Sequence, residues 1–193
     1  MEIRQVIVDR FIQETVNLLD SKKHEYAIMA TYKAPELWYQ FEITVLMHEY
    51  MLKNLPEWDL YVEKAHKDMF MLPGGCVLSE ESFRKGVNFE FKVAPSGDSM
   101  DKFYKDVEDL KGYEYGYLVV VYCNVNKDYP PCRQVGLKPN TDVFKAWDDF
   151  KNNMNSRSGK IITDKMFDTF EIPRKDNGGS LLKTGLAVGI WKC

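Results

Sequence analysis

The clearest strand signal in the chain is VNFEFKV, residues 87–93, and the other elements of the fold are placed relative to this strand. Apolar and polar side chains alternate along it, so Phe89 and Phe91 should point to one face of a sheet while Glu90 and Lys92 point to the other. This stretch therefore predicts a strand with a buried apolar face and an acid and a lysine side by side on its opposite face.

The segments next to this strand predict a mixed arrangement of strands and helices. WDLYVEK (58–64) and DMFML (68–72) indicate two strands before it, and residues 99–111 indicate an amphipathic helix after it. The apolar run GYLVVVYCNV (116–125) is typical of a central strand covered on both faces. Because a helix connects 87–93 to 117–124, we expect these two strands to run parallel.

Further elements extend this core at both ends. Helical spacing of apolar residues predicts additional helices at residues 2–20, 35–54 and 141–154, with late strands at KIIT (160–163) and GLAVGIW (185–191). The fold class expected is α/β, with a central mixed sheet flanked by helices, an N-terminal helix and C-terminal additions. No linker or repeat divides the sequence, so residues 1–193 are expected to form a single domain.

Composition narrows the function classes. The 193 residues are 45% hydrophobic and carry a formal net charge of −3, which disfavours a protein that simply coats nucleic acid. No signal peptide, membrane span or zinc-type cysteine spacing is visible, so a cytoplasmic protein that contacts no membrane is expected.

One pattern of charged residues resembles a known family. Asp68 opens one predicted strand, and Glu90 and Lys92 lie on the next, 22 residues after Asp68. This pattern, with the order helix, three strands, helix, strand, resembles the αβββαβ core of the PD-(D/E)XK, or restriction-endonuclease-like, nucleases over about residues 35–125. The residue before Asp68 is Lys67 rather than the proline of the family name.

The resemblance implies a metal-dependent phosphodiesterase, most naturally a DNA endonuclease of a restriction, repair or mobile-element type. Asp68, Glu90 and Lys92 would be catalytic. Asp68, Glu90 and the carbonyl of Phe91 would hold Mg²⁺, for which Mn²⁺ can substitute. A homodimer is a form in which such enzymes often act.

A third acid is expected from the helix at 35–54. Glu42 and Glu49 are the candidates, and Glu42 is preferred because Glu49 has Lys53 four residues away as a local partner. Asp59 and Glu63 are alternatives to Asp68 if the strand register differs. Nucleic-acid contacts are expected from basic residues near the site and in polar segments: His66, Arg84, Lys85, Arg157 and Lys160.

Two other readings stay open on the sequence alone. A catalytically inactive protein of the same fold could act as a nucleic-acid- or protein-binding module. An unrelated α/β domain with a small-molecule ligand would leave Glu90 and Lys92 as an ordinary surface pair, worth under about 1 kcal/mol. An intact set of Asp68, Glu90 and Lys92 favours the enzyme.

Overall fold

A central mixed sheet organises the molecule. The computed structural model describes residues 2–30, 35–64, 67–95, 100–124, 143–156, 159–167, 170–173 and 181–193. Neighbouring strands follow the order β1-β2-β3-β4-β7-β5, and β6 pairs with β7 away from this path. The strands are β1 (Trp58–Lys64), β2 (Lys67–Pro73), β3 (Val87–Pro95), β4 (Gly116–Asn124), β5 (Lys160–Met166), β6 (Phe170–Pro173) and β7 (Leu181–Lys192).

Strand directions confirm the expected parallel pair. β2 pairs antiparallel with both β1 and β3, whereas β3 and β4 are parallel. Both β4 and β5 pair antiparallel with β7. The sheet is therefore mixed and open, and its parallel step coincides with the helical crossover between β3 and β4.

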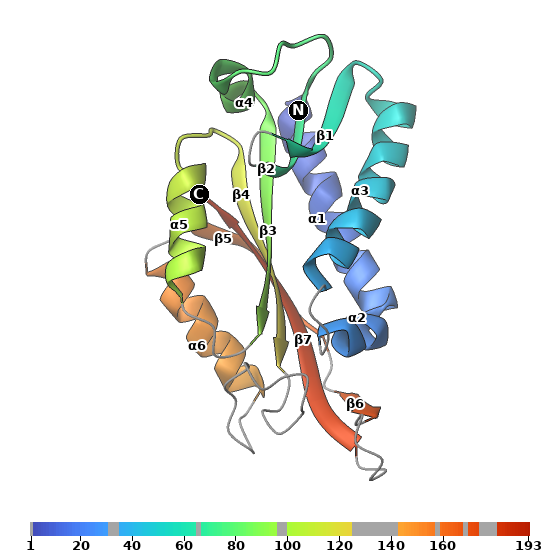
Figure 1. Cartoon of the computed structure of the whole chain (residues 1–193), viewed down its shortest axis with the longest axis vertical. Helices are drawn as coiled ribbons and strands as arrows, with labels where there is room; N and C mark the ends of the chain where they lie inside the picture. Colours follow the sequence, from blue (N-terminus) through green and yellow to red (C-terminus); the bar gives the residue numbers. More distant parts are fainter. Residues whose placement is uncertain are drawn as a thin grey trace.

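Helices cover both faces of the sheet (Figure 1). On one side lie α1 (Ile3–Ser21), α2 (Lys23–Ala30) and α3 (Pro35–Asn54); on the other lie α5 (Asp101–Leu110) and α6 (Val143–Asn155). The four helices expected from periodicity are all present, and the α/β class is confirmed. None of the helices in the described ranges is long and apolar enough to cross a membrane.

The core consists of two main layers separated by the sheet. Val87, Phe89 and Phe91 of β3 pack into the cluster beneath α1 and α3. Phe103 and Trp147 belong to the cluster beneath α5 and α6. The alternation expected along β3 is thus confirmed, and it leaves Glu90 and Lys92 on the same face as α5.

Three elements were not expected from the sequence. Residues 80–85 form a short helix, α4 (Glu80–Lys85), between β2 and β3. Its start is fixed by a capping box in which the Ser79 hydroxyl accepts from the backbone N–H of Ser82. The buried Asn88 amide then ties the helix to β3 by donating to the Phe83 carbonyl at 2.9 Å. The other two are α2 and β6.

Candidate active site

The candidate site lies where β3 extends past its pairing with β2. The last register pair between these strands is Met69↔Phe89. Continuing that register by one residue sets Asp68 directly opposite Glu90. Residues opposite one another on paired strands point to the same face, so Asp68 belongs to the face that carries Glu90 and Lys92.

Two carboxylates bond to the backbone of β3 beyond the end of the ladder. Asp68 Oδ2 accepts a hydrogen bond from the Phe91 N–H at 2.7 Å, and Glu36 Oε2 accepts from the Val93 N–H at 3.1 Å. These donors are two residues apart, so they lie on the same edge of the strand, spaced by roughly 6–7 Å. Gln40 adds a second restraint by donating to the backbone carbonyl of Asp68 at 2.9 Å.

Lys92 joins the strand acids to helix α5. Its Nζ lies 3.0 Å from Glu90 Oε1 and 3.7 Å from Asp106 Oδ2. The three side chains are only 19%, 15% and 16% exposed, respectively, so the pairs are largely shielded from water. Lys92 is therefore positioned between an acid of its own strand and an acid of the crossover helix.

Burial disfavours the charged form of the acids in this cluster. Burial raises the pKa of Glu90, and the neighbouring charge of Asp68 raises it further. Burial likewise raises the pKa values of Glu36 and Asp106 despite the opposing attraction of Lys92. Burial alone would lower the pKa of Lys92, but the surrounding acids, led by Glu90, reverse this and raise it.

The fit of these side chains to a divalent cation can be judged from their ligand atoms and their number. The carboxylates of Asp68 and Glu90 supply oxygen atoms only, which is the ligand type that Mg²⁺ prefers. Within the described ranges, however, no three His, Cys, Asp or Glu side chains converge closely enough to hold a metal ion by themselves. Mg²⁺ does not require three, because it commonly binds through one or two carboxylates and completes its shell with water and substrate oxygens.

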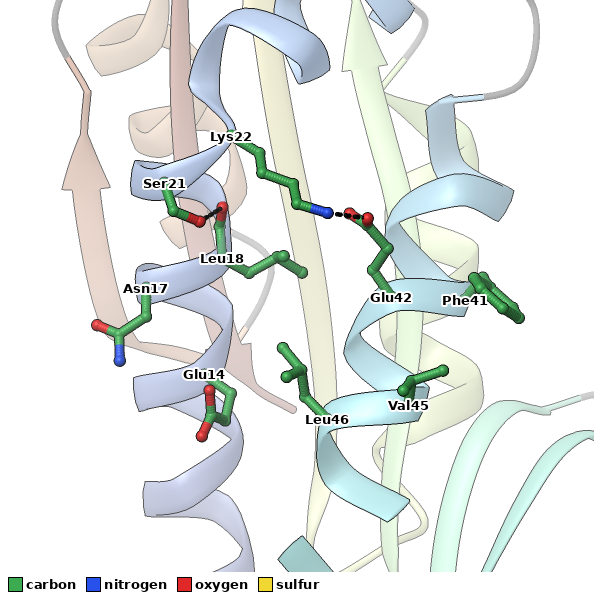
Figure 2. A pocket seen from close by; sticks show the side chains of 9 residues that line it. All are labelled: Glu14, Asn17, Leu18, Ser21, Lys22, Phe41, Glu42, Val45 and Leu46. Atoms are coloured by element: carbon green, nitrogen blue, oxygen red, sulfur yellow. Dashed lines mark hydrogen bonds and ion pairs between the residues drawn. The ribbon is translucent and has the colours of Figure 1, made fainter. Parts of the chain in front are cut away.

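Glu42 and Glu49, the expected third acids, lie elsewhere on α3. Glu42 pairs with Lys22 and accepts from the Tyr26 hydroxyl at 2.7 Å. It lines a groove of about 530 Å³ between α1 and α3 and points toward α1, as Figure 2 shows. Glu49 is exposed. The acid of α3 that bonds to β3 is instead Glu36, in its first turn.

The predicted nucleic-acid contacts are dispersed. Arg84 and Lys85 are exposed in the last turn of α4, where Lys85 pairs with Glu81 at 2.6 Å. Lys160 is exposed at the start of β5, a strand at the opposite edge of the sheet from β1. His66 and Arg157 lie outside the described residues. Of the alternatives to Asp68, both Asp59 and Glu63 are exposed on β1.

Sequence reasoning missed Glu36 and Asp106. Asp106 had a readable signal, because it lies three residues after Phe103 and four before Leu110, on the apolar side of an amphipathic helix. Glu36 follows Pro35 in a first helical turn, where acids are common for reasons of helix polarity alone. Its role depends on the placement of α3 against the end of β3.

Comparison of the chain with known protein families, curated proteins and solved structures finds no match in any of the three. What the structure offers instead is a cluster of charged side chains at the end of β3, made of Glu36, Asp68, Glu90, Lys92 and Asp106.

Proposed function

We propose that this protein is a Mg²⁺-dependent nuclease of the PD-(D/E)XK type, acting on DNA as an endonuclease. One observation carries the proposal: Asp68 and Glu90 share a face at the end of a strand pair, with Lys92 two residues further on and in contact with Glu90. These are the residue types and the spacing that the resemblance requires.

The chain order supports the same proposal. From α3 to β4 the elements run α3, β1, β2, the short helix α4, β3, α5 and β4, and β4 is parallel to β3. Apart from α4, which interrupts the strands between β2 and β3, this order is compatible with the αβββαβ core that the resemblance implies. The N-terminal helices and β5 to β7 are additions that complete the sheet and cover it.

Each charged side chain of the site would have a separate role in catalysis. A bound Mg²⁺ would lower the pKa of the attacking water and stabilise negative charge on the phosphate. Asp68 and Glu90 would supply its fixed oxygens, and the Phe91 N–H and Gln40 hold Asp68 in orientation. Lys92 would position the attacking water and offset charge on the phosphorane. Glu36 replaces Glu42 as the proposed third acid.

A cleavage assay tests this function. Plasmid, linear and single-stranded DNA are incubated with the protein and Mg²⁺ or Mn²⁺. The Lys92→Ala variant should lose at least about 100-fold in rate, the typical effect of removing one stabilising group from a reacting centre. Lys145→Ala is the matched control, because it removes an exposed lysine paired with Asp149 on α6 and should stay within about twofold of wild type.

Two results would remove the proposal: no cleavage of any of these DNAs by the wild-type protein, or full activity in Lys92→Ala. Circular dichroism of each variant shows that a lost activity does not reflect a lost fold.

A catalytically inactive binding module is the second candidate. It is favoured by the absence of a three-ligand cluster in the described part of the chain and by the direct pairing of Glu90 with Lys92. Calorimetric titration separates the candidates. Binding of Mg²⁺ or Mn²⁺ that Asp68→Ala abolishes supports the enzyme, whereas no binding supports the module.

A further inference from the structure

Lys92 sits between two carboxylates at unequal distances. Its Nζ makes a hydrogen-bonded ion pair with Glu90 Oε1 at 3.0 Å but lies 3.7 Å from Asp106 Oδ2, which is too long for a hydrogen bond. The ammonium is therefore hydrogen-bonded to Glu90, the carboxylate that would bind the metal ion in the proposed function. A cation entering the site meets an ammonium already on one of its ligands.

One carboxylate oxygen of Asp106 accepts no hydrogen bond. Its Oδ2 is buried and has no hydrogen-bond partner, which is a costly state for a carboxylate oxygen. A shift of the ammonium by about 1 Å toward Asp106 would close the gap to an ordinary charge-assisted hydrogen bond. The four-carbon stem of lysine accommodates such a shift without any movement of the backbone.

Helix α5 holds Asp106 in place through its buried neighbours. The neighbours of Asp106 on its helix, Phe103, Val107 and Leu110, are all buried in the cluster beneath α5 and α6. A well-packed helix of this kind resists displacement. Asp106 is thus an acceptor on a well-packed helix, and the Lys92 ammonium beside it is carried on a flexible stem.

We propose that Asp106 is a positioning residue that receives the Lys92 ammonium when a divalent cation takes Glu90. The inference depends on the proposed function, and it adds a second position for the catalytic lysine. Without a metal ion, Lys92 neutralises Glu90; with one, Lys92 pairs with Asp106 and remains beside the reacting phosphate. Asp106 itself touches neither metal nor substrate.

The test is a double-mutant cycle read by calorimetric titration with MgCl₂, independent of cleavage. Asp106→Asn should weaken Mg²⁺ binding by about 5–10-fold, because Lys92 is then left with Glu90 as its close anionic partner. Lys92→Ala should bind Mg²⁺ more tightly than wild type. In the Lys92→Ala background, Asp106→Asn should change the affinity by less than about twofold.

Asp109→Asn is the matched control, because it removes an exposed carboxylate from the same helix three residues away. It should leave Mg²⁺ affinity within about twofold of wild type, which separates a specific acceptor from general loss of negative charge. Circular dichroism establishes that each variant is folded.

The outcomes are distinguishable. An equal loss of affinity on Asp106→Asn with and without Lys92 would overturn this inference alone, since Asp106 would then act directly on the cation. An equal loss in Asp109→Asn would overturn it as well. A wild-type protein that binds neither Mg²⁺ nor Mn²⁺ would overturn the proposed function, and this inference with it.

Discussion

The carboxylate of Asp68 accepts the backbone N–H of Phe91 at 2.7 Å, and so it fills the place of a missing strand partner. β2 stops pairing with β3 at Met69↔Phe89, yet β3 continues to Pro95. The same side chain that we assign to the metal ion therefore also secures the sheet. Different substitutions of Asp68 can separate its hydrogen bond to the Phe91 N–H from its proposed binding of the metal ion.

Asp68→Ala and Asp68→Asn should differ in stability but not in activity. Alanine leaves the Phe91 N–H without its acceptor, at a cost of about 1–3 kcal/mol, whereas the asparagine carbonyl can still accept it. Both lack the carboxylate charge and should lose cleavage. Thermal unfolding should place asparagine near wild type and alanine lower by roughly 2–4 °C per kcal/mol. Equal melting temperatures for the two variants would contradict this account of Asp68.

Mg²⁺ should stabilise the folded protein. A ligand present at 100 times its dissociation constant adds about 2.7 kcal/mol of stability, or roughly 5–10 °C for a chain of this size. The shift should disappear in Glu90→Gln, which keeps the shape of the side chain but loses its charge. Differential scanning fluorimetry with and without MgCl₂ measures it, and an equal shift in both proteins would place the ion elsewhere.

Glu36 should make stability depend on pH. Burial raises the pKa of Glu36 above its value in the unfolded chain, so the folded state keeps the proton to higher pH. Its contribution to stability is then lost as pH rises through the interval between the two pKa values. Glu36→Gln cannot titrate, so its melting temperature relative to wild type should increase from pH 4 to pH 7. A difference that stays constant over this range would exclude Glu36 as the cause.

Substitution of Glu36 and Glu42 should distinguish the two acids of α3. Glu36→Gln removes a charge beside Asp68 and Lys92 and should weaken Mg²⁺ binding by about tenfold, as for residues that support metal ligands. Glu42→Gln disturbs only the pairing with Lys22 and Tyr26 and should leave Mg²⁺ affinity unchanged. Calorimetric titration of both variants measures this, and the opposite ranking would restore Glu42 as the third acid.

The local patterns of the sequence predicted most of the sheet that carries the site. Alternation along 87–93 correctly separated Glu90 and Lys92 from Phe89 and Phe91, because a strand with one face in the core has a strict period of two. The crossover helix correctly implied the parallel pairing of β3 and β4. The first inference needs only residues adjacent in sequence, and the second needs only the one connection between β3 and β4.

Contacts between elements that are distant in sequence could not be predicted from these local patterns. Glu36 reaches Val93 across 57 residues, and nothing in its own helical turn marks it out. The preference for Glu42 relied on its lack of a partner within α3, but its partners, Lys22 and Tyr26, come from residues that precede the helix. The pairing of β7 between β4 and β5 likewise depends on tertiary packing.

That position of β7 has a consequence for synthesis on the ribosome. β5 and β6 both emerge before β7, yet their sheet partner is β7 itself. Until β7 is made, the nascent chain carries β4 with one open hydrogen-bonding edge, and strands with open edges are prone to pair with other chains. Chaperone protection of this open edge during the interval should therefore favour the yield of folded protein.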